Sequence, residues 1–508
     1  MMTEQPPTPD PQAFTCSWVA HHARLRPDGV AVIHLGVHVN WRTLAASVIA
    51  ATDALSDIGL GAGQTLGIEL DDRYLHLVIM LAAECLGATT ISLDTSELGP
   101  PASLGRLCDR ILLSRPILLA RPVADAPSGF LVTPDWAVAV LTRPADDNAL
   151  DRLHRAPDPD MMLRLMKTSG TTGLPKVMGM TQRLLLGQID KMLLKIAPEI
   201  AAQPAFLCLY RFTMRAAHTR CMLTLRRGGT VHFTGADALW DTVAAGIGNY
   251  LYLLPGDLER FVRTAPGGHG RHNLHIDVTG GAVSPSLWAE TRAKLGVGLC
   301  VTYSTNEVHH IALVNENQVG RLFADARVRI VDDRGEALPP GATGLIQVQT
   351  ATMIEGYVGT PELTEAVFAG GWCHTADFGY QPDRDTLVVL GRADDMLNIG
   401  GVKLAPGPVE AQLRTIPGVS GALVTDLGDR LETGTLLVAI EVAAGANAAG
   451  TGEADARQAE IGHRVEQLIR GYRHPFRVLV VPALPRTETG KIRRDAVREL
   501  ARDRRAGA

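Results

Sequence analysis

The sequence contains no run of about 18 apolar residues, the length that a helix needs to cross a bilayer, so we expect no membrane span. Residues 1–14 lack the basic-then-apolar pattern of a signal peptide and are rich in proline and threonine, so we expect a short disordered lead there. Basic residues are not in excess, because 49 lysines and arginines face 54 aspartates and glutamates. The net charge of -5 therefore gives no bulk attraction to nucleic acid.

The chain also lacks the C-x-x-C pattern of redox and zinc sites. Its cysteines are scattered and odd in number, and they are Cys16, Cys85, Cys108, Cys208, Cys221, Cys300 and Cys373. A reduced, cytoplasmic environment fits this usage best, with most of the thiols acting as small core residues. The length of 508 residues is enough for several domains with sizeable cores.

Apolar strand-like segments alternate with helical segments through much of the chain. Strands are predicted at residues 30–33, 37–39, 64–70, 89–93, 205–209, 230–233, 250–254, 276–279 and 298–302, and helices at 41–58, 74–86 and 182–197. Such alternation is typical of an α/β fold with mostly parallel sheets covered by helices.

The pattern changes between residues 327 and 391, where short alternating strands are separated by Pro/Gly turns. That change predicts a small antiparallel or β-barrel-like subdomain at the end of a large N-terminal domain spanning 15–391. A compact α+β C-terminal domain is expected over 397–508. Within it, residues 443–454 are predicted to be a loop and the basic tail 493–505 a solvated helix.

Residues 167–176, with the sequence KTSGTTGLPK, combine four hydroxyls, two glycines and two lysines. Glycines let the backbone turn sharply, and hydroxyls and amides around such a turn form an anion-binding concavity. The usual P-loop pattern, G-x-x-x-x-G-K-[ST], does not occur. The segment therefore indicates a polyphosphate site of another kind.

This segment resembles the phosphate loop of the adenylate-forming superfamily, which contains acyl- and aryl-CoA synthetases, adenylation domains of nonribosomal peptide synthetases and beetle luciferases. Val177 stands where that loop usually continues with glycine. The resemblance implies that ATP or AMP is bound by Thr168, Ser169, Gly170, Thr171, Thr172, Gly173 and Lys176.

A second motif, YSTNE at residues 303–307, follows a predicted strand. An aromatic ring can stack on a base, and a carboxylate can hold Mg²⁺ beside phosphates. The resemblance implies that Tyr303 stacks on adenine and that Glu307 engages Mg²⁺, with Ser304 beside the nucleotide and Thr305 in the catalytic set. The family usually has threonine where Asn306 stands; an amide can still donate a hydrogen bond to the α-phosphate.

Further motifs follow in family order. Gly280, Gly281 and Ala282 resemble a glycine-rich strand end that touches substrate and adenine. Asp377 matches the aspartate that accepts hydrogen bonds from the ribose hydroxyls, although Ala376 replaces the usual preceding glycine. Arg392 matches an arginine near the ribose and phosphate.

The segment from residue 391 to 404 resembles the interdomain hinge signature of the superfamily. Asp394 matches the residue about which the C-terminal domain rotates, so the resemblance implies a hinge at 392–396 and a mobile lid at 397–508. Lys491, in the sequence TGKIRR, matches the lysine that bridges the substrate carboxylate and the α-phosphate. A cation at that point stabilises charge that builds up during adenylation.

Together these motifs imply an ATP-dependent ligase that converts a carboxylic acid to acyl-AMP with release of pyrophosphate. A thiol, CoA, then displaces AMP to give an acyl thioester. Mg²⁺ and cations offset the repulsion between the anionic nucleophile and the anionic phosphate. Two alternatives remain open: loading of a carrier-protein phosphopantetheine thiol in trans, and a degenerate, non-catalytic nucleotide-binding protein.

The substrate pocket is expected at Phe212, Thr213 and Gly280. Peptide synthetase domains carry an aspartate near Phe212–Thr213 that pairs with an α-ammonium, and its absence disfavours an α-amino acid. Arg211, Arg215 and His218 lie nearby and could meet a polar or second acidic group, but structural ion pairing or surface exposure is the favoured interpretation. The identity of the acid is left open.

Overall fold

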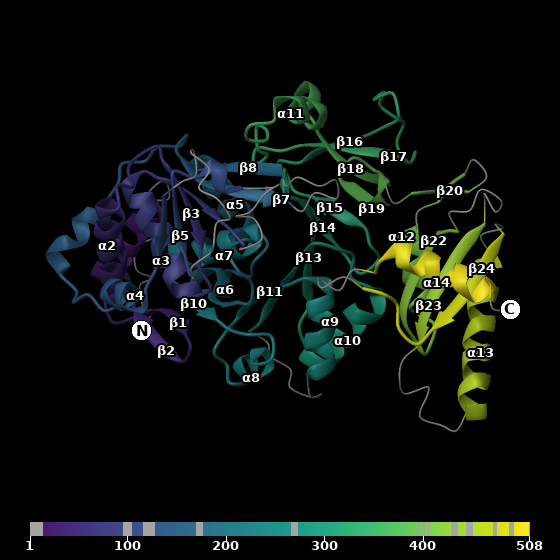
Figure 1. Ribbon diagram of the computed structural model, residues 1–508. Coiled ribbons are helices and arrows are strands. Elements are labelled where there is room, and N and C mark those ends of the chain that lie inside the picture. The colour runs from purple at the N-terminus through teal and green to yellow at the C-terminus, as the bar shows by residue number, and fades with distance from the viewer. Residues whose placement is uncertain are drawn as a thin grey trace.

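Figure 1 shows the computed structural model, in which a large part built on two sheets is followed by a small C-terminal part with its own sheet. The structure describes residues 14–94, 104–114, 128–168, 176–265, 273–393, 396–399, 402–404, 406–427, 435–442, 451–470, 475–486 and 492–506. No described helix is long and apolar enough to cross a membrane.

The first sheet has six strands in the order β6-β5-β3-β4-β7-β8. Its strands are β3 (Thr65–Glu69), β4 (Thr89–Ser92), β5 (Arg110–Leu113), β6 (Ser128–Leu131), β7 (Met162–Thr168) and β8 (Lys176–Thr181). All neighbours are parallel except β7 and β8, which form an antiparallel hairpin with Thr168 opposite Lys176. The predicted phosphate loop is therefore the connection of an edge hairpin.

The second sheet has 13 strands in the order β16-β17-β18-β19-β15-β14-β13-β12-β11-β9-β10-β1-β2. Its parallel part comprises β1 (Val30–His34), β9 (Ala205–Cys208), β10 (Thr230–Phe233), β11 (Tyr250–Leu253), β12 (His275–Val278) and β13 (Leu299–Thr305), with β2 (Val37–Asn40) antiparallel at its edge. Its antiparallel part comprises β14 (His309–Val314), β15 (Gly320–Leu322), β16 (Arg327–Val331), β17 (Gly344–Gln349), β18 (Cys373–Tyr380) and β19 (Thr386–Arg392).

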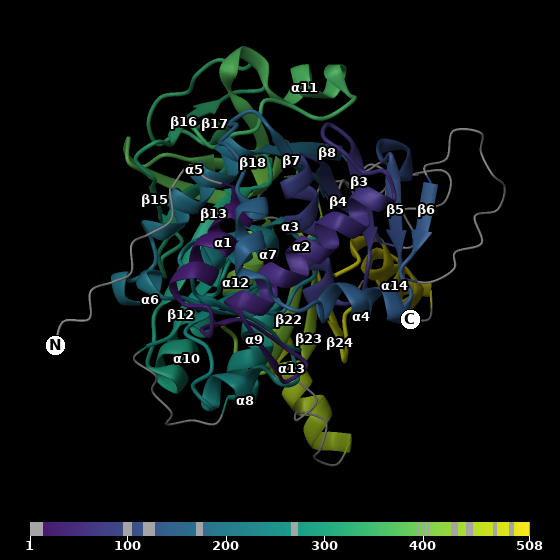
Figure 2. The same cartoon turned by 90° about the vertical axis from the view of Figure 1, so that its left-hand side faces the viewer.

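Helices form a layer that contacts both sheets, as Figures 1 and 2 show from two directions. The layer contains α1 (Thr15–Leu25), α2 (Trp41–Asp57), α3 (Arg73–Leu86), α5 (Gln182–Leu193) and α7 (Arg215–Arg226). Helix α3 begins where the Asp72 side chain accepts from the Leu75 N–H and ends at Gly87, whose φ of 76° is left-handed. The remaining helices of the large part are α4 (Pro134–Leu141), α6 (Pro198–Ala202), α8 (Leu239–Ala244), α9 (Pro255–Thr264), α10 (Pro285–Leu295) and α11 (Pro361–Val367).

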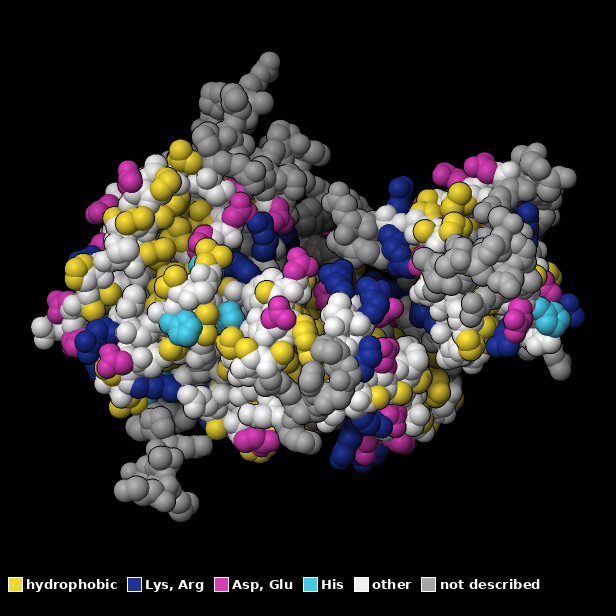
Figure 3. Space-filling view, turned by 90° about the horizontal axis from the view of Figure 1, so that it is seen from below, with side chains coloured by type: hydrophobic (Ala, Val, Ile, Leu, Met, Phe, Trp, Pro, Cys, Tyr) yellow, Lys and Arg dark blue, Asp and Glu magenta, His cyan; other side chains and the backbone are white. Residues whose placement is uncertain are grey.

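The C-terminal part contains the two-stranded sheet β20 (Leu397–Ile399) with β21 (Val402–Leu404), and the three-stranded sheet β22 (Val419–Asp426), β23 (Leu436–Val442) and β24 (Phe476–Val481). Its helices are α12 (Pro406–Leu413), α13 (Thr451–Arg470) and α14 (Arg494–Ala506). In the view of Figure 3, a hollow separates this part from the large part, and Lys and Arg side chains gather on both of its sides.

A buried ion triad lies in the core under the parallel strands. Lys195 Nζ is 2.6 Å from Asp277 Oδ1, and Arg220 Nε donates to Asp277 Oδ2 at 3.0 Å. Burial alone would raise the pKa of Asp277, but the charges of Arg220 and Lys195 outweigh it and hold that pKa well below its usual range. These cations are compensated within the fold.

The strand and helix predictions are confirmed in position, with local corrections. The helix from Gln182 ends at Leu193 rather than at residue 197, and a second helix starts at Pro198. The predicted loop 443–454 is wrong for its last four residues, because α13 begins at Thr451. Strands β16–β19 supply the expected small antiparallel region, joined to the large sheet through β15 and β19. All of the seven cysteines are free.

Candidate active site

Four chain segments lie at the carboxyl ends of four neighbouring strands in the 13-stranded sheet. Strands β9, β11, β12 and β13 are parallel, so their carboxyl ends face the same way. The chain at these ends comprises residues 209–214 after β9, 254–255 after β11 and 279–282 after β12, together with residues 303–307, which include the last three residues of β13. Ligands of parallel sheets commonly bind outside the carboxyl ends of the strands, and three of these four segments contain residues predicted from the motifs.

The YSTNE motif spans the last three residues of β13 and the first two residues of the turn that leads into β14. Thr305 pairs with His309 across the antiparallel strands, and the Val308 N–H donates to Thr305 Oγ1 at 3.1 Å. His309 adopts a left-handed φ of 70°, which lets the short turn close. The side chain of Asn306 is exposed, whereas those of Ser304 and Glu307 are half-buried.

Tyr303, Asp377 and Arg392 form a connected group. The Tyr303 hydroxyl donates to Asp377 Oδ2 at 2.6 Å, and Arg392 Nη1 donates to the Thr375 carbonyl at 2.9 Å and lies 3.4 Å from Asp377 Oδ1. Burial and the neighbouring Asp377 charge raise the pKa of Tyr303 well above its usual range, so Tyr303 remains a donor. Burial also raises the pKa of Asp377, which the Tyr303 hydrogen bond opposes.

Glu307 and Lys176 both contact Tyr357. The Tyr357 hydroxyl donates to Glu307 Oε1 at 2.8 Å, and Lys176 Nζ lies 5.3 Å from the centre of the Tyr357 ring. The Val358 N–H donates to the Val177 carbonyl at 2.8 Å, which holds the segment against β8. Tyr357 thus connects the start of β8, at the end of the phosphate loop, with the predicted metal residue.

Tyr357 is not among the residues predicted from the motifs, because no local pattern tells which distant carboxylate a tyrosine hydroxyl will meet. The two residues that it joins, Glu307 and Lys176, are far apart in sequence and reach it through the packing of residues 354–358 against both β8 and the YSTNE turn, where the Ile354 N–H donates to the Glu307 carbonyl at 2.9 Å.

The predicted substrate pocket residues lie at the same edge. Gly280 has a left-handed φ of 89°, and a Cβ placed there would lie 3.0 Å from Leu254 Cδ2, so the backbone passes close to the segment after β11. Gly281 and Ala282 are exposed. Phe212 is buried against the His76 and Phe233 rings, so its side chain belongs to the core, whereas Thr213 is half-buried.

The favoured interpretation of Arg215 and His218 is wrong. Both side chains are buried at the start of α7, and among the described residues neither takes part in an ion pair. Arg215 Nη1 donates to the Asn306 carbonyl and lies 3.5 Å from that of Thr305. Arg211 agrees with the expectation, because it is exposed and pairs with Asp71.

Several predicted residues lie outside the described part of the chain: Ser169, Gly170, Thr171, Thr172, Gly173, Asp394 and Lys491. Thr168 is the last residue of β7, and its side chain is likewise not described. The described strands on either side are β7, which ends at Thr168, and β8, which begins at Lys176.

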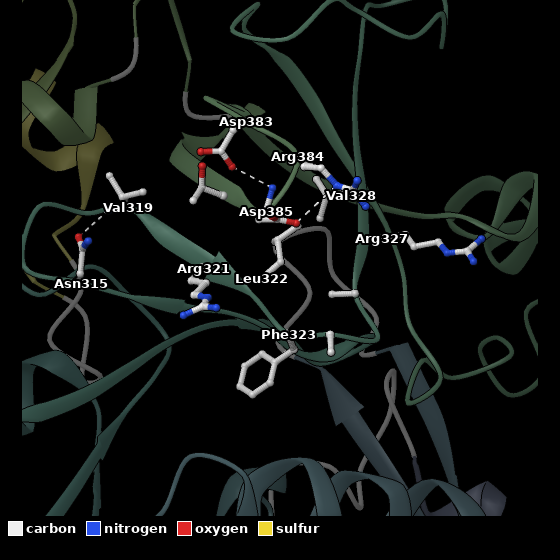
Figure 4. A pocket seen from close by; sticks show the side chains of 13 residues that line it. Asn315, Val319, Arg321, Leu322, Phe323, Arg327, Val328, Asp383, Arg384 and Asp385 are labelled. Atoms are coloured by element: carbon white, nitrogen blue, oxygen red, sulfur yellow. Dashed lines mark hydrogen bonds and ion pairs between the residues drawn. The ribbon is translucent and has the colours of Figure 1, made fainter.

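A separate groove of about 940 Å³ lies between β15, β16 and the turn before β19, and Figure 4 shows its lining. Arg321, Arg327 and Arg384 contribute positive charge to it, and Asp383 and Asp385 contribute negative charge. Its walls include none of the residues predicted from the motifs, so we do not place the reaction there.

The chain is similar to known proteins over most of its length. The family described as AMP-binding enzyme matches residues 19–358. Indoleacetate–CoA ligase from Aromatoleum aromaticum is 27% identical over 522 residues, covering 95% of this chain and 97% of that protein. Feruloyl-CoA synthase from an Amycolatopsis species is 26% identical over 508 residues, covering 95% and 98%.

Solved structures share the fold. ATP-bound MatB from Rhodopseudomonas palustris has a TM-score of 0.78 at 19% identity, covering 96% of this chain and 99% of that one. The o-succinylbenzoate coenzyme A synthetase from Bacillus subtilis, solved with ATP and magnesium ion, has a TM-score of 0.75 at 19% identity, covering 94% and 98%.

Proposed function

The chain belongs to the AMP-binding enzyme family, and we propose that it is an acid–CoA ligase that works through an acyl-adenylate. Support comes from curated relatives that are acid–CoA ligases over nearly the whole chain. The structural observation that carries the proposal is the joint placement of Tyr303, Asp377 and Glu307 at one edge of the sheet, beside Lys176.

In this proposal, ATP lies across the carboxyl ends of β12 and β13. The Tyr303 ring packs on adenine, and Asp377 accepts hydrogen bonds from the ribose hydroxyls, for which its two oxygens suit. Arg392 holds Asp377 and adds positive charge towards the phosphates. Lys176 and the hydroxyls and amides of residues 168–173 hold the polyphosphate.

Glu307 suits a magnesium ion bound with ATP. Its carboxylate is half-buried, and among the described residues its side chain accepts a hydrogen bond from one neutral hydroxyl, that of Tyr357. Among the described residues there is no group of three or more His, Cys, Asp or Glu that would form a complete metal cage. That is the expected pattern for Mg²⁺, which is usually held by one or two carboxylates plus substrate phosphates. The ion would neutralise phosphate charge during adenylation.

Two steps are assigned to the chain. Lys491 offsets the charge that develops as the substrate carboxylate attacks the α-phosphate, and the Thr305 hydroxyl and the Asn306 amide N–H act as hydrogen-bond donors beside the reacting group. We propose Asp394 as the pivot of a hinge at 392–396, by which the C-terminal domain exchanges the adenylating arrangement for one that admits the thiol. CoA is the proposed acceptor, and a carrier-protein phosphopantetheine is the alternative.

The proposal is tested by acid-dependent ATP–pyrophosphate exchange, followed by thioester formation with CoA. Exchange with a carboxylic acid and AMP release on adding CoA are expected. Exchange without CoA-dependent AMP release would favour the carrier-protein acceptor. Tight ATP binding with no exchange for any acid would mean that the departures at Asn306 and Ala376 have produced a non-catalytic nucleotide-binding protein.

A further inference from the structure

Two buried arginines near the proposed acyl site lack a carboxylate partner. Arg164 on β7 is 1% exposed and Arg215 at the start of α7 is 8% exposed. Among the described residues, neither guanidinium forms an ion pair, and the buried atoms Arg164 Nε, Arg215 Nε and Arg215 Nη2 have no hydrogen-bond partner. A buried guanidinium without a counter-ion is costly.

The contacts of Arg164 are all neutral. Its Nη2 donates to the Phe212 carbonyl at 2.7 Å and to Ser92 Oγ, and its Nη1 donates to Thr90 Oγ1 at 3.3 Å and lies 2.7 Å from Met80 Sδ. Burial lowers its pKa to about 9, which still leaves it charged at neutral pH. Arg164 therefore places an uncompensated positive charge directly beneath the loop that leads into α7.

Among the described residues, Arg215 hydrogen-bonds only to backbone oxygens, those of Thr305 and Asn306; the charge of Glu307 favours the charged form of Arg215, but the two side chains are not within ion-pair distance. Helix α7 adds to the positive character, since Met214 supplies no side-chain cap and the first turn contains no acidic residue. His76 and His218 contribute no negative charge either, and burial lowers the pKa of both, so they are neutral at pH 7.

Compensated cations in the same part of the fold show the contrast. Arg220, five residues after Arg215 on α7, pairs with Asp277, and Lys191 pairs with Asp325 at 2.7 Å. Where a buried cation is structural, this chain supplies a carboxylate. Its omission at Arg164 and Arg215 indicates that the counter-charge arrives with a ligand.

From this contrast, and resting on the proposed function, we propose that the substrate is a carboxylic acid with a second anionic group, a carboxylate or a sulfonate, which binds Arg215 near the start of α7. Arg164 strengthens the field there without needing to touch the ligand. Arg215 contacts the backbone carbonyls of Thr305 and Asn306, two residues that we place beside the reacting carboxylate. A short acyl chain would therefore span the distance between the reacting carboxylate and the second anion.

The test uses matched acids on one aliphatic and one aromatic scaffold, each ending in methyl, carboxylate or sulfonate: pentanoate, glutarate and 4-sulfobutanoate, and 4-methylbenzoate, terephthalate and 4-sulfobenzoate. Charge-assisted hydrogen bonds predict that kcat/KM in ATP–pyrophosphate exchange is about 10- to 100-fold higher for a dianion than for its methyl partner. Comparing the carboxylate-ended acids with the sulfonate-ended acids shows which of the two anions the site prefers.

Arg215→Met should remove this preference, so that its loss of kcat/KM is about 10- to 100-fold larger for the dianions than for their methyl partners. Arg215→Lys should keep part of the preference. Arg211→Met is the matched control, because Arg211 is exposed and already paired with Asp71, and it should leave the preference unchanged. Equal losses for both acid series in Arg215→Met would mean that Arg215 serves the reacting carboxylate or the turn, and would overturn the proposal.

A second readout does not depend on turnover. Thermal stabilisation by each acid without ATP should be larger for dianions in the wild type and absent in Arg215→Met, whose ligand-free Tm also checks its folding. No exchange with any acid, but dianion stabilisation that needs Arg215, would defeat the proposed ligase function and support the anion site. Exchange that favours methyl acids, with no dianion stabilisation, would support the ligase function and defeat the anion site.

Discussion

The hydroxyl of Tyr357 donates a 2.8 Å hydrogen bond to Glu307, and this one contact fixes the orientation of the carboxylate proposed to face magnesium. Burial, followed by the Glu307 charge, raises the pKa of Tyr357 above its usual range, so the phenol stays protonated and continues to donate. Glu307 is thereby left with its second oxygen for a cation. The first prediction follows from this division of roles.

Glu307→Gln should raise the Mg²⁺ concentration needed for half-maximal exchange by about tenfold or more, because the amide keeps the size but removes the charge that a hard cation prefers. Tyr357→Phe should have a smaller effect in the same direction, since it frees the carboxylate to rotate. Titration of magnesium in the exchange reaction measures both. An unchanged magnesium dependence in Glu307→Gln would show that another group holds the ion.

Asp377→Asn should raise the KM for ATP by about 10- to 100-fold, the range expected for losing charge-assisted hydrogen bonds. The substitution keeps an acceptor for the Tyr303 hydroxyl, so stability should change little. Asp383→Asn provides the control, because Asp383 is an exposed turn residue near the start of β19. Equal KM values for ATP in the two variants would remove Asp377 from the nucleotide site.

Ala376→Gly should stabilise the protein by about 1 kcal/mol, because Ala376 has a left-handed φ of 57° that costs a residue with a Cβ roughly that amount. This geometry also gives a physical reason for the glycine that the superfamily carries at this position. Chemical denaturation measures the difference. A loss of stability would mean that the Ala376 methyl makes packing contacts worth more than the backbone strain.

Asp277→Asn should destabilise the fold by about 3 to 5 kcal/mol, since it leaves the buried Arg220 and Lys195 without their shared carboxylate. The folded-state pKa of Asp277 lies below its unfolded value, so its stabilisation is present above about pH 4 and is lost as the pH falls further. Unfolding measured between pH 3 and pH 7 should therefore show a shallower acid loss in Asp277→Asn. Glu290→Gln on the surface of α10 serves as the control.

Lys491→Ala should lower the rate of adenylate formation by about 10²- to 10³-fold, the effect of removing one preorganised charge. Thioester formation from supplied acyl-AMP should suffer less, because the proposed rotation carries Lys491 away for that step. Comparing the two half-reactions decides the matter. Acid-dependent exchange at the wild-type rate would exclude Lys491 from the chemistry.

The elements that could be predicted from the sequence were those with strong local patterns. The helix at Trp41 and the strand Thr230–Phe233 begin where their apolar period begins. The end of α5 at Leu193 was not predicted, because the helical pattern of the sequence continues past that residue. Boundaries of this kind are decided by tertiary contacts.

The site was predictable where a motif holds its residues together. Tyr303 and Glu307 are four positions apart, and their proximity to Asp377 had to be taken from the family resemblance. Local sequence gave no sign of the Tyr357 contact or of the missing partners of Arg164 and Arg215. A basic residue without a counter-ion looks the same in a sequence as one with a distant aspartate, so only the packed structure distinguishes Arg215 from Arg220.

Strand pairing is unbroken from β16 to β2. The strand that carries Asp377, β18, therefore belongs to the same hydrogen-bonded sheet as β9, β11, β12 and β13, whose carboxyl ends carry the predicted substrate and nucleotide residues. Ligand binding to β18 should therefore raise the unfolding temperature of the entire sheet as a cooperative unit. Strands β22–β24 form a sheet of their own and, within the described chain, share no ladder with it. In calorimetry, nucleotide should accordingly raise the unfolding temperature of the part that contains the 13-stranded sheet more than that of the part that contains β22–β24. Such a difference would show that the two parts unfold separately within the intact chain.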